Sequence, residues 1–450
     1  MSIIKHDLHD SFQSNHNKIT IGNKFKWSGF LVQVSFHGAM ASVGCSSVLV
    51  DTGIEKIVLD YGVKIQEIPP IFPIPIQGKI DAVMLSHAHL DHSGAVPVFH
   101  AKKNGVRTFA PNVTKQLSEL LWLDSIKISR EEGVELPFNK KDVNETLRNF
   151  APTNFRTPFK LKKTKVTLFD AGHIPGSTMP FLDTGEKTIL YTGDYKIADT
   201  RLMKGADTNL PRVDIFITES TYCDRDHPDR NSQEKALVDI VNSTLANDGI
   251  ALISGFAVGR IDELLLVLDK HGIDYPVYVD GMAKKALTII NQNRNMLKEP
   301  KSLNKALEKV EYVKDQGMRK RIVKNPGVIL TTSGMLSGGP VMWYISKLFD
   351  KRNCSLTLTG FQVEGTPGKT LLETGRYINE SIDVQVDMPV RKLDFSSHLG
   401  RGDLFDFIDK LNPEKIFCVH GDHAEDFARE LKEKGYDAVA PLANNRIFNI

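Results

Sequence analysis

The stretch Ser86-His87-Ala88-His89-Leu90-Asp91-His92-Ser93-Gly94 decides how the rest of this chain is interpreted. It follows the apolar run 80–85, which has the pattern of a buried strand, and the segment 95–103 after it predicts a short helix closed by Gly105. The polar side chains of the stretch are therefore expected on a loop at the carboxyl end of a strand, where α/β proteins usually place their chemistry.

Three imidazoles and one carboxylate this close together cannot all be buried without partners. Zn²⁺ would satisfy all four, because it binds histidine nitrogen and aspartate oxygen equally well. His87 and His89 share one side of an extended segment, whereas Asp91 and His92 turn away, which suits two neighbouring metal ions better than one. The alternative interpretation is a solvent-exposed, histidine-rich loop without a ligand.

Other histidines and acids also follow predicted strands. His173 comes after the β-like segment 164–169 and Asp194 after 188–191, each beside glycine, and this recurrence favours metal ligands over turn residues. The remaining members of this set are Asp60 at the end of 56–60, Glu219 after 213–218, His398 at the end of a β-like stretch, and His420 after 415–419.

Composition places the chain among ordinary globular proteins. It has 450 residues, 41% of them hydrophobic and 25% charged, which predicts two to three domains. Its formal net charge is only +2, so a nucleic-acid surface would have to come from local clustering of charge. The segment 284–324 is locally basic, and a solvated helix face and a nucleic-acid contact surface both remain open for it.

The four cysteines are scattered and form no C-x-x-C pair, which argues against disulfides and fits a reducing cytoplasm. The sequence shows no apolar run long enough to span a membrane and no signal peptide. Residues 1–26 are polar and lack periodicity, so we expect a flexible leader there.

From residue 213 the pattern changes to repeating strand–loop–helix units, which predict a doubly wound sheet extending to about 388. One of its helices is predicted over 233–246 with Ser232 as the cap. Two glycine-rich loops open helices and are able to hold phosphate on backbone N–H groups. The candidate RNA contacts in these loops are Arg260, Ser333 and Gly334.

Together these motifs make the chain resemble the metallo-β-lactamase superfamily and, within it, the β-CASP nucleases. Residues 30–450 resemble most the archaeal relatives of the eukaryotic pre-mRNA 3′-end cleavage subunit, with the exonuclease RNase J next. The resemblance implies an αββα sandwich interrupted by an α/β domain. The expected parts are a leader at 1–26, a lactamase domain at 27–212 and 389–450, and a β-CASP domain at 213–388.

The resemblance also implies roles for individual residues, and two zinc ions per chain. One ion would be held by His87, His89 and His173, the other by Asp91, His92 and His420, with Asp194 bridging and catalytic. Asp60 would orient a ligand. His398 would act on the leaving oxygen, with Glu219 as its orienting partner.

The function that this implies is a zinc-dependent hydrolysis of phosphodiester bonds in single-stranded RNA, for 3′-end processing or decay, leaving a 5′-phosphate and a 3′-hydroxyl. An endonuclease is favoured, with 5′–3′ exonuclease activity as an alternative mode. Two other readings are a small-molecule hydrolase, such as a thioesterase, and an inactive RNA-binding scaffold. The sequence leaves the natural RNA target open, and also the oligomeric state, for which a homodimer is one alternative.

Overall fold

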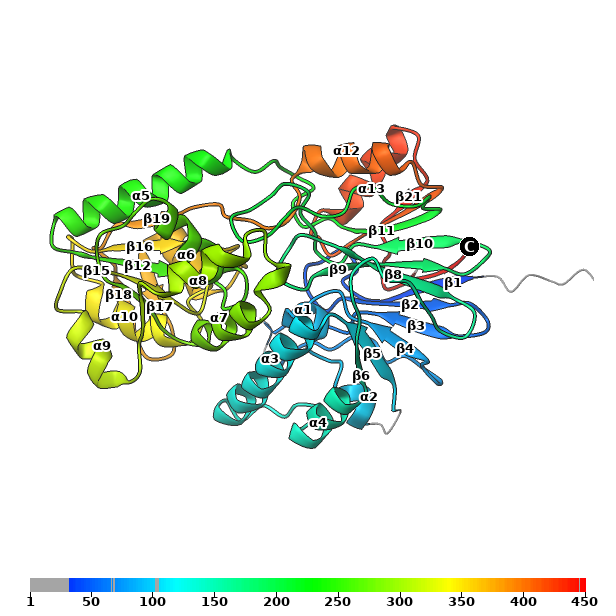
Figure 1. Cartoon of the computed structure of the whole chain (residues 1–450), viewed down its shortest axis with the longest axis horizontal. Coiled ribbons are helices and arrows are strands. Elements are labelled where there is room, and N and C mark those ends of the chain that lie inside the picture. Colours follow the sequence, from blue (N-terminus) through cyan, green and yellow to red (C-terminus); the bar gives the residue numbers. More distant parts are fainter. Residues whose placement is uncertain (1–31, 66, 68, 102–104, 445) are drawn as a thin grey trace, which may run out of the picture.

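A computed structural model describes residues 32–65, 67, 69–101, 105–444 and 446–450. The chain forms a two-sheet sandwich and a separate α/β domain, which lie next to each other (Figure 1). The leader predicted at 1–26 lies outside the described residues. Within the described ranges, no helix is long and apolar enough to cross a membrane.

The first sheet of the sandwich has seven strands in the order β22-β1-β2-β3-β4-β5-β6. Strands β1 to β3 are antiparallel, whereas β3 to β6 run parallel. The last strand of the chain, β22, returns to pair with β1, opposing Phe448 to Val34. The bounds are β1 Gln33–Gly38, β2 Ser47–Asp51, β3 Lys56–Leu59, β4 Ala82–Met84, β5 Arg107–Ala110, β6 Phe150–Pro152 and β22 Ile447–Asn449.

The second sheet also has seven strands, in the order β21-β20-β11-β10-β9-β8-β7. Its centre is parallel, because β11 pairs in parallel with both β10 and β20. The carboxyl ends of these three strands therefore meet at one edge of the sheet. The bounds are β7 Phe159–Lys160, β8 Lys165–Asp170, β9 Thr178–Asp183, β10 Thr188–Tyr191, β11 Ile215–Glu219, β20 Lys415–Val419 and β21 Ala438–Val439.

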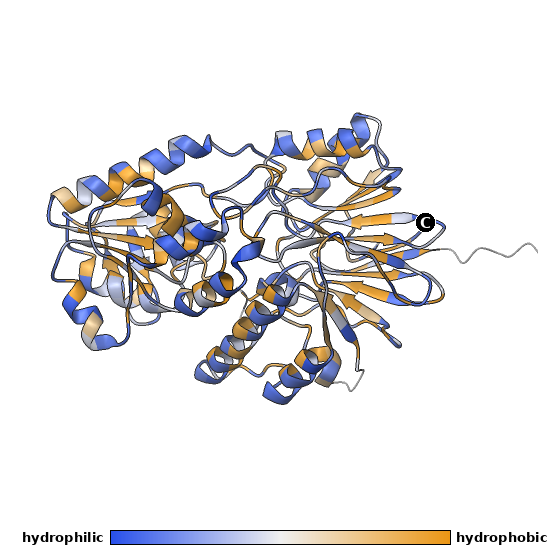
Figure 2. Cartoon of the chain, in the orientation of Figure 1, coloured by the Kyte–Doolittle hydropathy of each residue, from blue (hydrophilic) through white to orange (hydrophobic). Residues whose placement is uncertain are grey.

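The two sheets pack face to face around one apolar core. Phe36 and Leu59 from the first sheet share this cluster with Ile217 and Phe417 from the second. Helices α2 (Val98–Ala101), α3 (Asn112–Glu131) and α4 (Lys140–Arg148) cover the first sheet, and α12 (Arg401–Leu411) and α13 (Ala424–Glu433) cover the second (Figure 1). Figure 2 shows the strands between these layers as largely hydrophobic and the helices as two-sided. The αββα sandwich is confirmed.

The inserted domain is built on a six-stranded, fully parallel sheet in the order β14-β13-β15-β12-β16-β19. Apolar cores lie on both of its faces, as expected for a doubly wound sheet. Its strands are β12 Ile250–Ser254, β13 Val277–Val279, β14 Val310–Tyr312, β15 Gly327–Thr331, β16 Ser355–Leu358 and β19 Val390–Lys392. Its helices are α5 Arg230–Ala246, α6 Arg260–Lys270, α7 Ala283–Gln292, η1 Arg294–Met296, α8 Pro300–Leu307, α9 Gln316–Ile322, α10 Pro340–Leu348 and α11 Pro367–Thr374, and a hairpin joins β17 Arg376–Ile378 to β18 Asp383–Gln385.

The strand arrangement moves the boundaries of this insertion. Strand β11 begins at Ile215 yet belongs to the sandwich, while β19 extends the inserted sheet to Lys392. We therefore propose that the insertion runs from about 220 to 393 rather than from 213 to 388. Pattern alone could not place β11, because a buried parallel strand looks the same in either sheet.

Two local predictions were wrong. In place of one helix over 95–103, the chain forms α1 (Leu90–Ser93) and α2, because the Ala95 N–H donates to the Tyr61 carbonyl at 2.8 Å and not to the preceding turn of the first helix. Asp91 and His92 therefore lie within α1. Helix α5 starts earlier than predicted, and its cap is Asp229, whose side chain accepts the Ser232 N–H at 2.8 Å.

Candidate metal centre

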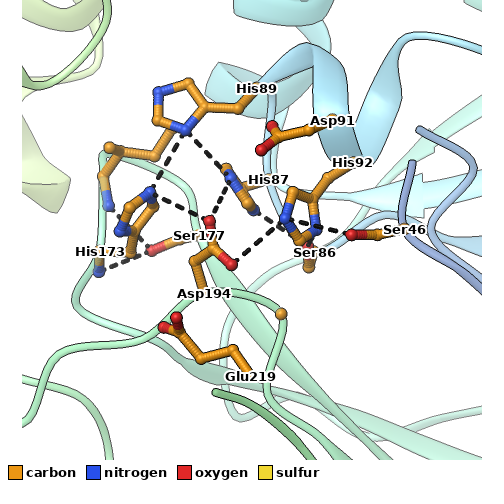
Figure 3. A network of polar contacts seen from close by, with 12 residues as sticks. Ser46, Ser86, His87, His89, Asp91, His92, His173, Ser177, Asp194 and Glu219 are labelled. Atoms are coloured by element: carbon orange, nitrogen blue, oxygen red, sulfur yellow. Dashed lines mark hydrogen bonds and ion pairs between the residues drawn. The ribbon is translucent and has the colours of Figure 1, made fainter. Parts of the chain in front are cut away.

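The histidine-rich motif begins three residues after β4 and closes into the single turn of α1 (Figure 3). It faces the carboxyl ends of the central strands of both sheets. His87 and His92 have 0% and 1% of their surface exposed, so the motif is not the solvent-exposed loop of the alternative interpretation.

The first ligand group consists of His87, His89, His173 and Asp194, whose candidate ligand atoms all lie within 4.8 Å of one another. His89 Nδ1 is 3.2 Å from His87 Nε2 and 3.3 Å from His173 Nε2. Asp194 Oδ2 lies 3.5 Å from the first of these Nε2 atoms and 3.7 Å from the second. Donors held roughly 2.1 Å from a tetrahedral zinc ion are separated by roughly 3.4 Å, so this spacing fits such an ion.

The second group consists of Asp91, His92, Asp194 and His420. The other oxygen of Asp194, Oδ1, lies 3.2 Å from His92 Nε2 and 3.5 Å from His420 Nδ1. His420 Nε2 is 3.4 Å from Asp91 Oδ2. Asp194 therefore directs one oxygen to each group, which is the arrangement a bridging carboxylate needs.

Buried hydrogen bonds hold several of these rings through the nitrogen that faces away from the cluster. Asp60 Oδ2 contacts His92 Nδ1 at 2.7 Å and also accepts the Tyr191 hydroxyl at 2.8 Å. The Ser397 carbonyl accepts His173 Nδ1 at 2.8 Å. In the neutral ring, each contact holds the proton on Nδ1 and leaves the lone pair on Nε2, which is the tautomer that binds a metal.

Burial and charge set the protonation of the cluster. Burial lowers the pKa of His87 and of His173 well below the ordinary value, so these rings are neutral. Although burial favours the neutral ring of His92 too, Asp194 and Asp91 raise its pKa well above the ordinary value. Burial opposes ionisation of Asp194, but His92 and His420 hold its pKa well below the usual range. A metal ion requires neutral imidazoles and ionised carboxylates, so His87, His173 and Asp194 are already in the form that binds a metal, whereas His92 would give up a proton on binding.

Among the described residues, some polar atoms of the two ligand groups have no hydrogen-bond partner. Asp194 Oδ1 and His420 Nε2 are buried and make no hydrogen bond, despite the near approaches above. His89 Nδ1 approaches both His87 Nε2 and His173 Nε2, and because it carries at most one proton to share between them, a cation among the three rings would satisfy their lone pairs better. The donor set of five histidines and two aspartates fits a pair of borderline-soft cations such as zinc.

A carboxylate–histidine pair borders this cluster. Glu219 Oε2 contacts His398 Nδ1 at 2.7 Å, and Glu219 Oε1 accepts the Tyr195 N–H at 2.9 Å. Both residues form a third group with Asp194 inside the same 4.8 Å limit. The His398 side chain is 18% exposed, against 0–4% for His87, His92, His173 and His420, so it faces the solvent side of the site.

The surroundings favour a protonated His398. Burial favours the neutral ring, but the Glu219 and Asp194 carboxylates raise the pKa of His398 above its ordinary value, and Arg260 opposes that rise. Its Nδ1 is occupied by Glu219, so Nε2 is the atom that can give a proton to a substrate.

All seven predicted ligands, with Asp60, Glu219 and His398, are brought together by the strand ends. Asp60 and His420 directly follow β3 and β20 and adopt left-handed backbone angles, with φ of +60° and +52°. Such strained positions in non-glycine residues gather at functional sites. The His420 N–H donates to the Ala39 carbonyl at 2.9 Å, so the uncharged loop 38–44 supports this ligand.

The three predicted RNA contacts lie outside the ligand groups, in the inserted domain. Arg260 is the first residue of α6, and Ser333 and Gly334 follow β15. Ser333 Oγ accepts the Gly338 N–H at 3.2 Å and the Gly334 carbonyl accepts Gln362 Nε2 at 2.9 Å, so these groups bond within their own domain. Their role toward RNA stays a prediction.

Sequence reasoning missed several residues that shape the site. Ser86 donates both its N–H and its hydroxyl to Asp60, each at 2.6 Å, and Tyr191 supports the same carboxylate. Lys196 Nζ donates to the His398 carbonyl at 2.9 Å. Ser86 and Lys196 adjoin predicted ligands in sequence, and that adjacency was the available signal; Tyr191 looked like an ordinary strand residue.

Comparison with known families agrees with this geometry. Residues 261–371 match the Beta-Casp domain, and residues 383–441 match the Zn-dependent metallo-hydrolase RNA specificity domain. Residues 39–221 match the family of the anti-Pycsar protein Apyc1. A probable RNase, MJ4 of Methanocaldococcus jannaschii, is 38% identical over 92% of this chain and 100% of its own length. The chain belongs to the β-CASP branch of the metallo-β-lactamase superfamily.

Other β-CASP relatives cover most of the chain as well. RNase aCSPSF2 of Saccharolobus solfataricus is 33% identical over 90% of this chain and 82% of its own length. Transcription termination factor FttA of Methanosarcina mazei is 32% identical over 87% of this chain and 67% of its own length. A solved structure of a protein of unknown function from Enterococcus faecalis shares the fold, with a TM-score of 0.58 at 14% identity over 93% of this chain and 100% of that one.

Proposed function

We propose that this β-CASP protein is a zinc-dependent ribonuclease that hydrolyses phosphodiester bonds in single-stranded RNA. The observation that carries the proposal is the position of Asp194, which belongs to both ligand groups and also to the group formed by Glu219 and His398. A paired metal site is thereby joined directly to a proton donor. The relatives that are named ribonucleases support the same activity.

In this proposal His87, His89 and His173 hold one zinc ion, Asp91, His92 and His420 hold the other, and Asp194 contacts both. Two neighbouring metal ions would stabilise the charge of the scissile phosphate as Lewis acids and would supply a water nucleophile at neutral pH. Asp60 fixes the ring of His92 and so orients that ligand.

The chain's own acid is His398. Its Nε2 would give a proton to the leaving 3′-oxygen, while Glu219 holds the ring and stabilises its charged form. Since the nucleophile is an external water, the 2′-hydroxyl is not a reactant. The products are then a 5′-phosphate and a 3′-hydroxyl rather than a cyclic phosphate.

We favour cleavage at internal bonds, with removal of nucleotides from a 5′ end as the alternative. The four cysteines are buried free thiols, which fits work in a reducing compartment such as the cytoplasm.

The experiment is a time course with single-stranded RNA labelled at either end, alongside a model thioester. Internal fragments at early times indicate an endonuclease, and early release of single nucleotides indicates an exonuclease. Mass spectrometry should find 5′-phosphate ends, and a 2′-deoxy sugar at the scissile nucleotide should leave cleavage in place. Turnover of the thioester without RNA cleavage would contradict the proposal, and so would a cyclic phosphate product.

A further inference from the structure

Arg260 is a partly buried cation for which the described part of the chain provides no acceptor. Its Nε and Nη1 atoms are buried and have no hydrogen-bond partner. Two other partly buried arginines differ, because Arg201 Nε meets Glu234 at 2.8 Å and Arg319 Nε meets Asp280 at 2.6 Å. A guanidinium offers five donors in a planar fork, and burying its charge unpaired is costly. An anion that is not part of the protein would remove that cost.

The local backbone holds Arg260 at the boundary between the two domains. A Cβ built on Gly255 would lie 2.8 Å from Arg260 Cγ, so the arginine side chain folds back over the loop that precedes its helix. A Cβ on Gly259 would lie 2.6 Å from Ile174 Cγ2, so the same loop rests on the residue next to His173. Glycine at 259 therefore lets the inserted domain approach the loop that carries His173.

A second cation lies in the same region. Lys196 Nζ donates to the main-chain carbonyl of His398 at 2.9 Å, and among the described residues it forms no ion pair with a carboxylate. Arg260 also lies close enough to His398 for its charge to oppose the rise in the pKa of that ring. Both cations thus lie near His398, the residue that the proposed function places beside the leaving oxygen.

Two of the acids near these cations, Asp394 and Glu263, already have partners. Asp394 Oδ2 contacts His227 Nδ1 at 2.9 Å. Glu263 pairs with Arg230 and accepts the Leu202 N–H at 2.7 Å. The guanidinium of Arg260 therefore keeps donors that these two acids do not take, and its planar fork matches the oxygens of a phosphate.

We propose that Arg260 and Lys196 form a subsite for the backbone phosphate one nucleotide to the 5′ side of the scissile bond. The polarity rests on the proposed function: if the leaving group is a 3′-oxygen protonated by His398, the nucleotide beside His398 is the upstream one. Its own 5′-phosphate is then the first backbone anion beyond the scissile phosphate on the side of His398. The fork of Arg260 would bind two of its oxygens, and Lys196 would add a single charge.

The direct test replaces that one phosphate. An RNA whose cleavage site has been mapped is prepared with a neutral methylphosphonate one linkage 5′ of the scissile bond, and a second RNA carries the same change four linkages 5′. With the wild-type enzyme the near substitution should lower kcat/KM about 10- to 100-fold, because a hydrogen bond to a charged group is lost. The distant substitution should have little effect.

The variant Arg260→Met tests whether the loss of rate on the near methylphosphonate comes from the contact with Arg260. It should cut unmodified RNA about 10- to 100-fold more slowly, and should lose no further rate on the near methylphosphonate. Arg260→Lys keeps the positive charge but not the planar fork, so its cleavage rate should lie between those of the wild type and Arg260→Met. If Arg260→Met does not fold, Arg260→Lys is compared on the unmodified and the methylphosphonate RNA instead. Arg352→Met is the matched control, because this arginine is 82% exposed and precedes β16, at the opposite edge of the inserted sheet.

A binding measurement removes catalysis and metal from the test. In the presence of a chelator, the affinity of wild-type protein for a short RNA should fall with salt more steeply than that of Arg260→Met, by about one unit of slope on a log–log plot. Equal slopes, or additive losses from the variant and the methylphosphonate, would overturn the subsite. Failure of the wild-type enzyme to cut any RNA would instead overturn the proposed function.

Discussion

Two clusters of buried charged residues lie at the carboxyl ends of parallel strands, one around Asp194 and one around Asp280. They differ in the partners that their carboxylates find. In the inserted domain Asp280 follows β13, is 0% exposed, and accepts Arg319 Nε at 2.6 Å, the Tyr344 hydroxyl at 2.9 Å and the Gly281 N–H at 2.7 Å. In the sandwich, Asp194 meets imidazoles and leaves Oδ1 without a hydrogen bond. The two aspartates therefore occupy similar positions in the fold. Asp280 has a cationic partner and hydrogen-bond donors from the protein, as a structural ion pair does, whereas Asp194 keeps an oxygen free for a ligand.

The largest effect expected from this comparison is that of Asp194→Ala. If Asp194 joins two metal ions, the variant should lose metal, and RNA cleavage should fall by more than the ~10²–10⁴-fold that removal of a general acid costs. Metal content and cleavage rate measured on the same preparation check this. Asp239→Ala on the exposed face of α5 is the control and should change neither. An Asp194→Ala protein with full metal content would remove the basis of the comparison.

His398→Ala separates proton donation from metal binding within the sandwich site. The variant should keep its metal and cut RNA about 10²–10⁴-fold more slowly, because the donor to the leaving oxygen is lost. Elemental analysis with single-turnover cleavage is the measurement. Loss of metal in this variant would mean that His398 is a ligand and that the acid has to be sought elsewhere.

Arg319→Met examines the satisfied cluster. It leaves Asp280 buried without its main partner, so the free energy of unfolding should fall by about 3–5 kcal/mol, whereas metal content of the folded protein should not change. Denaturant titration gives the stability. The double variant Asp280→Leu/Arg319→Met should recover part of the loss, since no isolated charge remains. An unaltered stability in Arg319→Met would show that the pair contributes nothing structural.

Asp60→Asn should have the smallest effect of these variants, because Asp60 contacts the proposed ligand His92 and would not bind the metal itself. Loss of the charged acceptor at 2.7 Å from His92 Nδ1 should weaken metal binding about 10- to 100-fold without abolishing it. Competition with a chromophoric chelator measures this. Tyr191→Phe removes one donor to the same carboxylate and should have a smaller effect. Equal affinity in Asp60→Asn and wild type would show that the ring of His92 is held by other contacts.

Local sequence patterns predicted the doubly wound inserted sheet and placed histidines and acids at strand ends, whereas the αββα sandwich was expected from the resemblance to the metallo-β-lactamase superfamily. Strands 188–191 and 415–419 were predicted with exact bounds, since each is a short, largely apolar run that ends at polar residues. The seven ligand positions followed from histidines and acids at strand ends. Their roles as ligands remain a proposal.

What local pattern could not give is the pairing between distant segments. β11 reads as the first strand of the insertion but pairs with β10 and β20. Asp280 has the same signature as Asp194, an acid after a buried strand beside glycine, and only the partners supplied by Arg319 and Tyr344 show that it is structural. The lone guanidinium of Arg260 is likewise visible only once its surroundings are known.

The central claim is that the unsatisfied cluster of the sandwich is a binuclear metal site. It is tested most directly by the metal content of protein purified without chelator and then equilibrated with zinc. The account predicts two zinc ions per chain, since the two ligand groups share only Asp194 and seven donors exceed what one tetrahedral ion takes. A content that stays at one ion or below after zinc repletion would contradict it.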